Sequence, residues 1–298
     1  MNFNSIKSRD FYARFSDESS CLAYLASLKW SEGYCCRKCG STSYMPGKKA
    51  HSRRCKHCKY DESPTSHTLF HKIKFPLTKA FDFLFNITTK KKGVSTLGLS
   101  QELELSYETC LNFRRKAQKA MESSQNHPLT GNVEVDEFAV GGYDPESPGR
   151  AKGDKKLVVV ALEVRNGRFG RAYAKPIKNY SAKEIIKLFE EHVSQEANVR
   201  TDQWKGYLPI QKAYTLLTQE KSENGQNFQE LHLHIMNIKN WIRGIHHHIS
   251  EQYINRYLDE FHFRFNRRGF RKSIFHKIIQ RMVKSEPILH AQLIVKET

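Results

Sequence analysis

No apolar run in the sequence approaches the roughly 20 residues needed to span a bilayer, and the first ten residues lack the apolar stretch of a signal peptide. Hydrophobic residues make up 39% of the chain and charged residues 27%, which is typical of a soluble globular protein. With 298 residues, the chain is long enough for one large domain or two to three small ones. We therefore expect a cytoplasmic protein that does not use a membrane.

Acidic residues are scarce relative to basic ones. The chain has 31 Asp and Glu against 49 Lys and Arg, a formal net charge of +18. Residues 37–119 contain 18 basic and 6 acidic residues, and residues 264–281 contain seven basic residues and no acid. A positive surface attracts polyanions and gives salt-sensitive affinity for nucleic acid. A solubility charge or an anionic membrane surface would not explain the other features below, so we expect nucleic acid as the partner and a nucleoid-associated protein.

Cysteines are also few, but four of the seven form two Cys-x-x-Cys pairs separated by 15 residues. Each pair can present two thiolates from a tight turn, and two pairs close a tetrahedral zinc site. Disulfides are rare in a reducing compartment, and a redox motif of this kind normally occurs once. Cys35 is a rival for the first ligand, although the spacing favours its neighbour. The predicted ligands of a structural Zn²⁺ are Cys36, Cys39, Cys55 and Cys58, in a zinc ribbon over 31–62 that follows an N-terminal helical segment over 1–30.

Residues 70–122 are predicted to form a small helical module. Apolar residues recur with helical spacing over 72–86, and two shorter helices are predicted at 96–103 and 106–121. Two helices joined by a short turn are typical of a helix-turn-helix, but also of a structural helical linker. If the module reads DNA, the second helix enters the major groove and its polar side chains mostly grip phosphate. The expected contacts on that helix are Asn112, Arg114, Arg115 and Lys116.

The middle of the chain, residues 130–270, alternates strands with a helix. Strands are predicted at 132–140, 156–164 and 168–177, followed by an amphipathic helix at 181–194 and a short strand at 199–202. This is the order of a ribonuclease H-like core, an α/β fold with a mixed sheet whose first and fourth strands are neighbours. Asp136 lies in the first strand and Asp202 ends the fourth. The fold therefore predicts that these two carboxylates meet.

Two adjacent carboxylates repel, so they are stable together only when protonated or when a cation lies between them. Mg²⁺ prefers oxygen ligands and keeps coordination positions for water and phosphate, and two such ions can activate an attacking oxygen while stabilising the leaving one. An aspartate at a strand end can also cap a turn or pair with a lysine, such as Lys155 or Lys205. The pair, the strand order and the basic front end together favour phosphodiester chemistry with two Mg²⁺ or Mn²⁺ ions.

Several motifs, in this order, resemble those of bacterial insertion-sequence transposases that join a zinc ribbon to a DDE-type, ribonuclease H-like core. The resemblance runs over most of the chain, and the order is more specific than any single motif. Besides the paired Cys-x-x-Cys sequences, the motifs are Lys92-Gly93-Val94-Ser95, Val133-Glu134-Val135-Asp136-Glu137, Val140-Gly141-Gly142, Thr201-Asp202-Gln203-Trp204-Lys205-Gly206-Tyr207, His246-His247-His248-Ile249-Ser250, Arg256-Tyr257-Leu258-Asp259-Glu260-Phe261 and Arg264-Phe265-Asn266-Arg267-Arg268.

The resemblance implies that Asp136 and Asp202 bind the catalytic metals and that a third residue comes from a helix after the last strand. The expected region, 235–243, contains no Glu or Asp. One subgroup of the family resembles this chain in having Asn at the third position with a basic residue further on, which points to Asn237 and Arg243. An amide oxygen is a neutral ligand, so this site should hold a metal more weakly than three carboxylates do.

Alternatives for the third position stay open. Glu230 is the nearest upstream acid, and Asn240 could share a helix with Asn237 one turn away. Asn237 could also simply cap a helix.

The resemblance implies a transposase that binds the terminal inverted repeats of its own element in double-stranded DNA. It would cut the element ends by metal-dependent hydrolysis and join the 3′ hydroxyls to target DNA. Holding two ends together implies a homodimer or a larger oligomer. Arg267 and Arg268 are further expected DNA contacts, and residues 271–298 are expected to form a basic C-terminal tail or helix. The alternatives are a catalytically inactive DNA-binding derivative and a metal-dependent nuclease without strand transfer.

Overall fold

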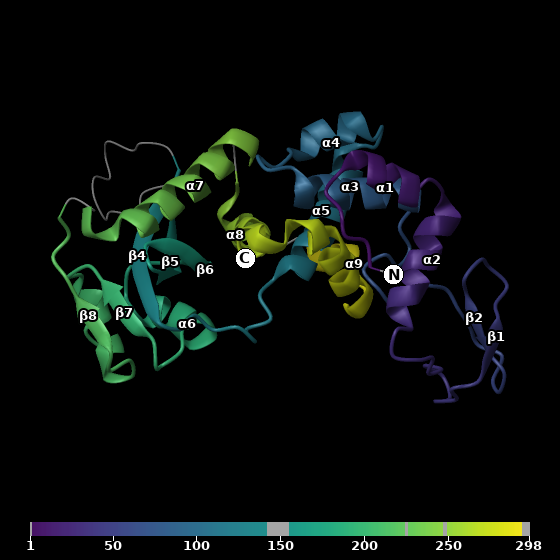
Figure 1. The fold of residues 1–298 in the computed structure, drawn as a ribbon, viewed down its shortest axis with the longest axis horizontal. Coiled ribbons are helices and arrows are strands. Elements are labelled where there is room, and N and C mark those ends of the chain that lie inside the picture. Colours follow the sequence, from purple (N-terminus) through teal and green to yellow (C-terminus); the bar gives the residue numbers. More distant parts are fainter. Residues whose placement is uncertain (1, 142–154, 224–225, 247–248, 294–298) are drawn as a thin grey trace. The chain divides into compact units, whose positions relative to one another are not determined.

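The structure is a computed structural model, which describes residues 2–141, 155–223, 226–246 and 249–293 (Figure 1). The chain divides into two compact units, one that runs to Met121 and resumes at Gly269, and one from Glu122 to Arg268. Of the motifs noted above, Gly142, His247 and His248 lie outside the described residues, as do the last five residues of the chain. In the described part of the chain, no helix has the length and apolar character of a membrane span.

The second unit is built on a mixed five-stranded sheet with the order β6-β5-β4-β7-β8. The strands are β4 (Asn132–Val140), β5 (Lys156–Arg165), β6 (Arg168–Ile177), β7 (Asn198–Thr201) and β8 (Leu217–Gln219). Strands β4, β5 and β6 are antiparallel, whereas β4, β7 and β8 pair in parallel. The predicted α/β class and ribonuclease H-like strand order are confirmed, including the pairing of the first and fourth strands. Strand β8, which is only three residues long, was not predicted.

Helices cover both faces of this sheet (Figure 1). They are α6 (Ala182–His192) on one face, and α7 (Gln229–His246) and α8 (Ile254–Phe265) on the other. Alternate residues of β5 therefore enter different cores: Val159 packs with Leu188 of α6, and Val160 packs with Ile235 of α7. Because both faces are buried, β5 is a nearly continuous run of Val, Leu and Ala. Short 3₁₀ turns lie at Lys205–Tyr207, Ile210–Lys212, Gln226–Phe228, Glu251–Tyr253 and Arg268–Ser273.

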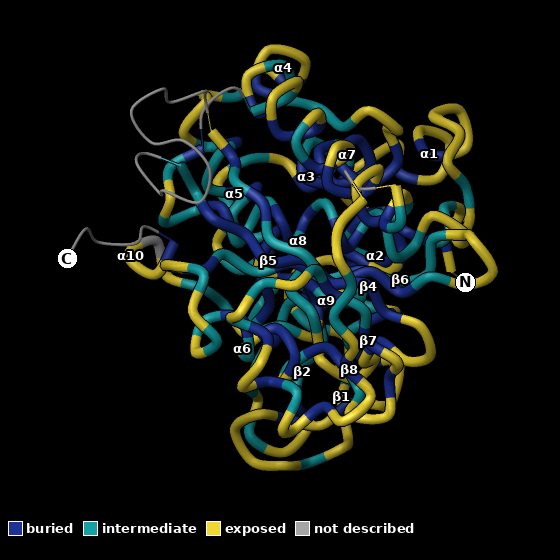
Figure 2. Tube along the Cα trace, turned by 90° about the vertical axis from the view of Figure 1, so that its left-hand side faces the viewer, coloured by how far each residue is buried: buried dark blue, intermediate teal, exposed yellow. Residues whose placement is uncertain are grey.

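The first unit is mostly helical. Its helices are α1 (Ser8–Arg14), α2 (Glu18–Lys29), α3 (Leu77–Thr89), α4 (Thr96–Glu102), α5 (Tyr107–Met121), α9 (Ile274–Lys284) and α10 (His290–Leu293). Helix α3 is the most enclosed, since ten of its 13 residues are buried (Figure 2). It occupies the centre of the unit because its apolar side chains cover most of its circumference.

The C-terminal helix α9 belongs to the core of this first unit. The Phe275 ring lies 5.4 Å from that of Phe11 and 5.7 Å from that of Phe81, centroid to centroid. The Tyr24 hydroxyl and His276 Nδ1 are 2.6 Å apart and both side chains are buried. The last helices of the chain thus complete a core that begins at its N-terminus. The five domain boundaries given above stay predictions.

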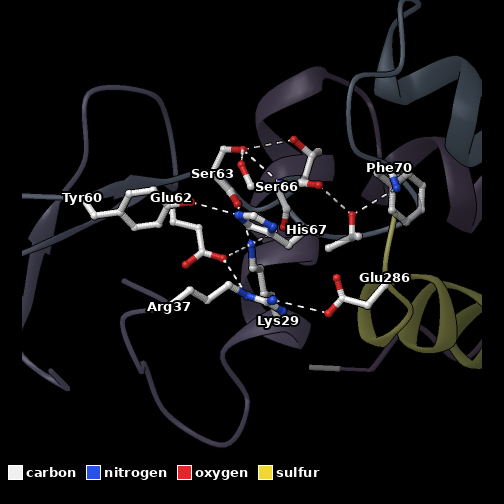
Figure 3. A network of polar contacts seen from close by, with 11 residues as sticks. Lys29, Arg37, Tyr60, Glu62, Ser63, Ser66, His67, Phe70 and Glu286 are labelled. Carbon is white, nitrogen blue, oxygen red and sulfur yellow. Dashed lines mark hydrogen bonds and ion pairs between the residues drawn. The ribbon is translucent and has the colours of Figure 1, made fainter. Parts of the chain in front are cut away.

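A small three-stranded sheet carries the cysteine pairs, with β1 (Tyr44–Pro46), β2 (Arg53–Cys55) and β3 (Asp61–Glu62) in antiparallel order. Lys29 at the end of α2 ties this sheet to the helices (Figure 3). Its ammonium lies 2.6 Å from the buried carboxylate of Glu62 and donates to the carbonyls of Ser63 and Ser66. Arg37 approaches the same carboxylate at 3.7 Å. Because the buried charge of Glu62 is paired, the sheet has a fixed attachment to α2.

Candidate active site

Two parallel strands place the predicted aspartates side by side. Val135 of β4 is the register partner of Thr201 of β7, so Asp136 and Asp202 occupy the next position on each strand. One pair earlier, Glu134 and Arg200 form an ion pair at 3.1 Å. Side chains two residues apart project from the same face of a strand, so Asp136 points to the face that carries this ion pair.

Backbone amides hold both carboxylates. Asp136 Oδ1 accepts a hydrogen bond from Glu137 N at 2.7 Å, and Asp202 Oδ1 accepts one from Trp204 N at 3.0 Å. Both aspartates are only partly buried, which leaves oxygen atoms accessible to a cation. Asp136 in the middle of β4 and Asp202 just after the end of β7 can therefore present anionic oxygens in fixed positions.

The side chain of Tyr207 lies near both aspartates and near Glu137. This side chain is completely buried in the 3₁₀ turn after β7. Burial raises the pKa of the Tyr207 phenol well above its usual value, and the negative charges of Glu137, Asp136 and Asp202 raise it further. The Tyr207 phenol therefore stays neutral, and three acidic side chains lie near it.

Helix α7 adds His232, a residue that the sequence analysis did not identify. Its Nε2 lies 3.4 Å from Asp136 Oδ2, and 43% of its side chain is exposed. This contact raises the pKa of His232. The first turn of α7 packs on the sheet through the buried Leu231, whose backbone lies near the carboxylate of Glu134 on the same strand. The imidazole thus reaches Asp136 on the central strand of the sheet.

Lys239, also missed from the sequence, lies two turns further along α7. Its ammonium is 5.5 Å from the centroid of the Phe138 ring on β4. Burial lowers the pKa of Lys239, while the charge of Asp136 opposes this shift and that of Arg243 adds to it. A seven-residue separation places Lys239 and His232 on nearly the same face of the helix. This face of α7 therefore combines an imidazole and an ammonium near Asp136, with Arg243 one turn beyond Lys239.

The predicted third residue, Asn237, lies on an exposed part of α7. At 3.6 residues per turn, it projects about 140° around the helix from His232. Asn240 is exposed as well. Across the described residues, no hydrogen bond joins Asn237 to either aspartate, and its assignment as a metal ligand stays a prediction. The structure places Asp202 beside Asp136 on neighbouring strands, and His232 of α7 next to Asp136.

The four predicted zinc ligands meet in the ribbon. The sulfur atoms of Cys36, Cys39, Cys55 and Cys58 all lie within 4.8 Å of one another. This matches the spacing of about 3.8 Å expected between thiolates that share a tetrahedral zinc ion at 2.3 Å. The pKa of the Cys55 thiol is lowered to about 6, mainly by a hydrogen bond from the backbone of Cys58. A lower pKa favours the thiolate, which is the form that binds zinc. Cys35 is exposed and lies outside the cluster, as the spacing predicted.

The predicted DNA contacts on helix α5 differ in how far they are exposed to solvent. Arg114 is completely buried, where its guanidinium donates to the carbonyl of Val94 at 2.9 Å and to the Thr96 hydroxyl at 3.2 Å. It therefore joins α4 to α5 inside the unit and is not presented at the surface. Asn112, Arg115 and Lys116 are partly exposed.

Arg267 and Arg268 follow α8 and engage its last turn. The Arg267 guanidinium lies 3.9 Å from the centroid of the Phe263 ring and donates to the Phe263 carbonyl. Arg268 donates to the carbonyls of Phe169 and Gly170 on β6. Both side chains thus help to fix the end of α8 in the second unit.

Two family models match the chain. An ISXO2-like transposase domain matches residues 128–266, and a transposase zinc-ribbon domain matches residues 16–61. The first match contains the strands and helix that present Asp136, Asp202 and His232, and the second contains all four clustered cysteines. A search of curated proteins finds no match. Together the two domain matches cover more than half of the chain, which therefore belongs to the insertion-sequence transposases that carry a zinc ribbon before an ISXO2-like transposase domain.

Proposed function

We propose that this protein recognises the terminal inverted repeats of its insertion sequence, cleaves the DNA at the element ends and joins those ends to target DNA. The observation that carries the proposal is the register of β4 and β7, which sets Asp136 beside Asp202. The net charge of +18 suits a polyanionic substrate. The match to a transposase domain over this same sheet supports the assignment.

In this proposal, Asp136 and Asp202 hold the catalytic Mg²⁺ or Mn²⁺ ions. The carboxylates fit such ions because they are anionic, partly exposed and oriented by backbone amides. Two bound divalent ions would supply a deprotonated nucleophile and stabilise the leaving oxygen of the phosphodiester. Lys239 would orient the scissile phosphate, since its positive charge lies on α7 near Asp136, and Arg243, one turn further along the helix, would add to the positive charge there.

The ribbon and helix α5 would position the DNA. Zinc bound to the four cysteines would fix the ribbon without entering the reaction. Asn112, Arg115 and Lys116 on α5 would contact the DNA backbone, while the buried Arg114 would act by holding α4 against α5. Two element ends require at least two such sets of contacts, so we infer a homodimer or larger assembly on DNA.

The first prediction concerns cleavage of double-stranded DNA that carries the element's own ends. Asp136→Asn and Asp202→Asn should each lower the rate at least ~10³-fold in Mg²⁺ or Mn²⁺, because each change removes an anionic ligand. DNA binding measured by fluorescence anisotropy should stay within about twofold of the unchanged protein, since affinity for DNA comes mainly from basic side chains, which both variants keep.

Glu196→Gln, an exposed acid of the same unit, provides the matched control and should cleave normally. Cleavage by either aspartate variant at the unchanged rate would contradict the site assignment. Binding of the element ends without any cleavage by the unaltered protein would instead favour the inactive DNA-binding derivative.

A further inference from the structure

We propose that His232 is the third protein ligand of the catalytic centre and that its nitrogen makes the centre prefer Mn²⁺ to Mg²⁺. This inference rests on the proposed function, because it takes Asp136 and Asp202 as the other two ligands. It assigns a role to a residue that neither the sequence motifs nor the domain matches single out.

The separation between His232 and Asp136 suits two ligands of one ion. Ligand atoms that meet at a right angle about 2.1 Å from an octahedral cation lie about 3 Å apart. His232 Nε2 and Asp136 Oδ2 are 3.4 Å apart. A shift of a few tenths of an ångström would bring both atoms to coordination distance.

The packing of α7 gives the imidazole a defined position. Leu231, Ile235 and Ile238 are buried against the sheet and set the rotation of the helix. The backbone of Leu231 lies near the carboxylate of Glu134, two residues before Asp136 on β4, and opposes the rise that burial causes in the pKa of Glu134. Because the buried residues on both sides of His232 pack against the sheet, the imidazole is held beside Asp136 by the protein itself.

Exposure also distinguishes His232 from a purely structural histidine. The His232 side chain is 43% exposed and that of Asp136 is 23% exposed, so solvent and phosphate can reach both groups. By contrast, His234 and His262 are almost completely buried and contact each other through their Nε2 atoms. An accessible imidazole beside an accessible carboxylate can complete a coordination shell that also contains water and substrate.

The donor set determines the preferred metal. Mg²⁺ strongly favours oxygen and dehydrates reluctantly, whereas imidazole nitrogen suits divalent first-row transition metals. Two carboxylates and one imidazole also carry one negative charge fewer than three carboxylates do. Both effects weaken Mg²⁺ binding, and the nitrogen compensates for the lost charge when the ion is Mn²⁺.

Metal binding to the full-length, zinc-loaded protein tests the proposal without a measurement of activity. Titration calorimetry should show that Mn²⁺ binds at least about tenfold more tightly than Mg²⁺. His232→Ala should weaken Mn²⁺ binding by about tenfold or more. His232→Glu should raise the affinity for Mg²⁺ and narrow the difference between the two metals. Met236→Ala, at an exposed position of the same helix, is the matched control and should bind both metals normally.

Pulsed electron paramagnetic resonance of bound Mn²⁺ provides a direct signature of ligation. The spectrum should show coupling to an imidazole nitrogen, which His232→Ala removes and Met236→Ala retains. The inference is overturned if the coupling is absent from the unaltered protein or persists in His232→Ala. If Asp136→Asn weakens Mn²⁺ binding and His232→Ala does not, only the role of His232 fails. If neither variant weakens binding, the proposed metal centre fails as well.

Discussion

The zinc ribbon and the aspartate centre are assembled in opposite ways. The four cysteines come from two short turns of one small sheet, and their sulfur atoms already lie within 4.8 Å of one another. Asp136, Asp202 and His232 come from two strands and a helix that are far apart in sequence. Within the described ranges, the cysteines form the one closed cluster of metal-ligating side chains. A closed set of thiolates suits a structural ion, whereas an open set of carboxylates leaves coordination positions for water and phosphate.

The largest effect on stability is expected from a change in the four-cysteine zinc site. Cys55→Ser should abolish tightly bound zinc and unfold the ribbon, because zinc binding supplies on the order of 10 kcal/mol of folding free energy in small zinc domains. Metal analysis of the purified protein checks the zinc content, and near-ultraviolet circular dichroism checks the fold. Cys35→Ser is the matched control and should keep its zinc. One tightly bound zinc ion per chain in the Cys55→Ser protein would refute the structural site.

The second prediction concerns the stability at low pH of the unit that carries Asp136 and Asp202. His262 is buried behind α7, and this burial lowers its pKa to about 4. The unfolded chain, with an ordinary histidine pKa near 6.5, binds this proton more readily, so stability is lost as the pH falls from about 6.5 to 4. The loss attributable to this group is about 3 kcal/mol. Urea unfolding followed by tryptophan fluorescence across this range measures it.

His262→Asn should weaken this acid dependence without abolishing it, because the replacement cannot take up a proton but burial also lowers the pKa values of His192 and His234 in the same unit. His127→Asn changes an exposed histidine of the same unit and should leave the dependence intact. Identical acid sensitivity in the His262→Asn protein and the unaltered protein would show that other groups govern it.

The smallest effect concerns the stability of the metal-free aspartate centre. Asp136→Asn should change the free energy of unfolding by less than about 1 kcal/mol, because it relieves repulsion from Asp202 but loses attraction to His232 and Lys239. Thermal unfolding with and without Mn²⁺ measures this, and Mn²⁺ should stabilise only the unaltered protein. If Asp136→Asn lowers the free energy of unfolding by several kcal/mol without metal, Asp136 is a structural residue, as Cys55 is, and the two sites do not differ in this respect.

The same contrast explains what could be predicted from the sequence. The cysteine ligands follow from local spacing, which needs no knowledge of the fold. The meeting of Asp136 and Asp202 required the strand order, and β4 and β7 do pair as that order predicts. His232 required one further fact, the rotation of α7 about its axis. That rotation is set by Leu231, Ile235 and Ile238 packing on the sheet, and many polar residues surround this apolar stripe in the sequence.

Arg114 and helix α9 illustrate a second limit. Composition alone assigns a basic residue to the surface, yet Arg114 lies between the buried residues Cys110 and Ala117 on one face of α5. Its charge is accommodated because the Val94 carbonyl and the Thr96 hydroxyl accept its hydrogen bonds. Similarly, the basic residues after 268 predict an exposed tail, whereas α9 has an apolar stripe that packs Phe275 into the core. Both cases depend on tertiary partners that local patterns do not reveal.

Strand transfer tests the central claim most directly, because it separates a transposase from a nuclease with the same core. The substrate is a DNA duplex that carries one pre-cut element end, and the target is a supercoiled plasmid in Mn²⁺ or Mg²⁺. We predict that the unaltered protein joins the 3′ hydroxyl to the plasmid, and that Asp136→Asn and Asp202→Asn bind the duplex but yield no joined product. Joining at an undiminished rate in either variant would contradict the account, as would cleavage without any joining by the unaltered protein.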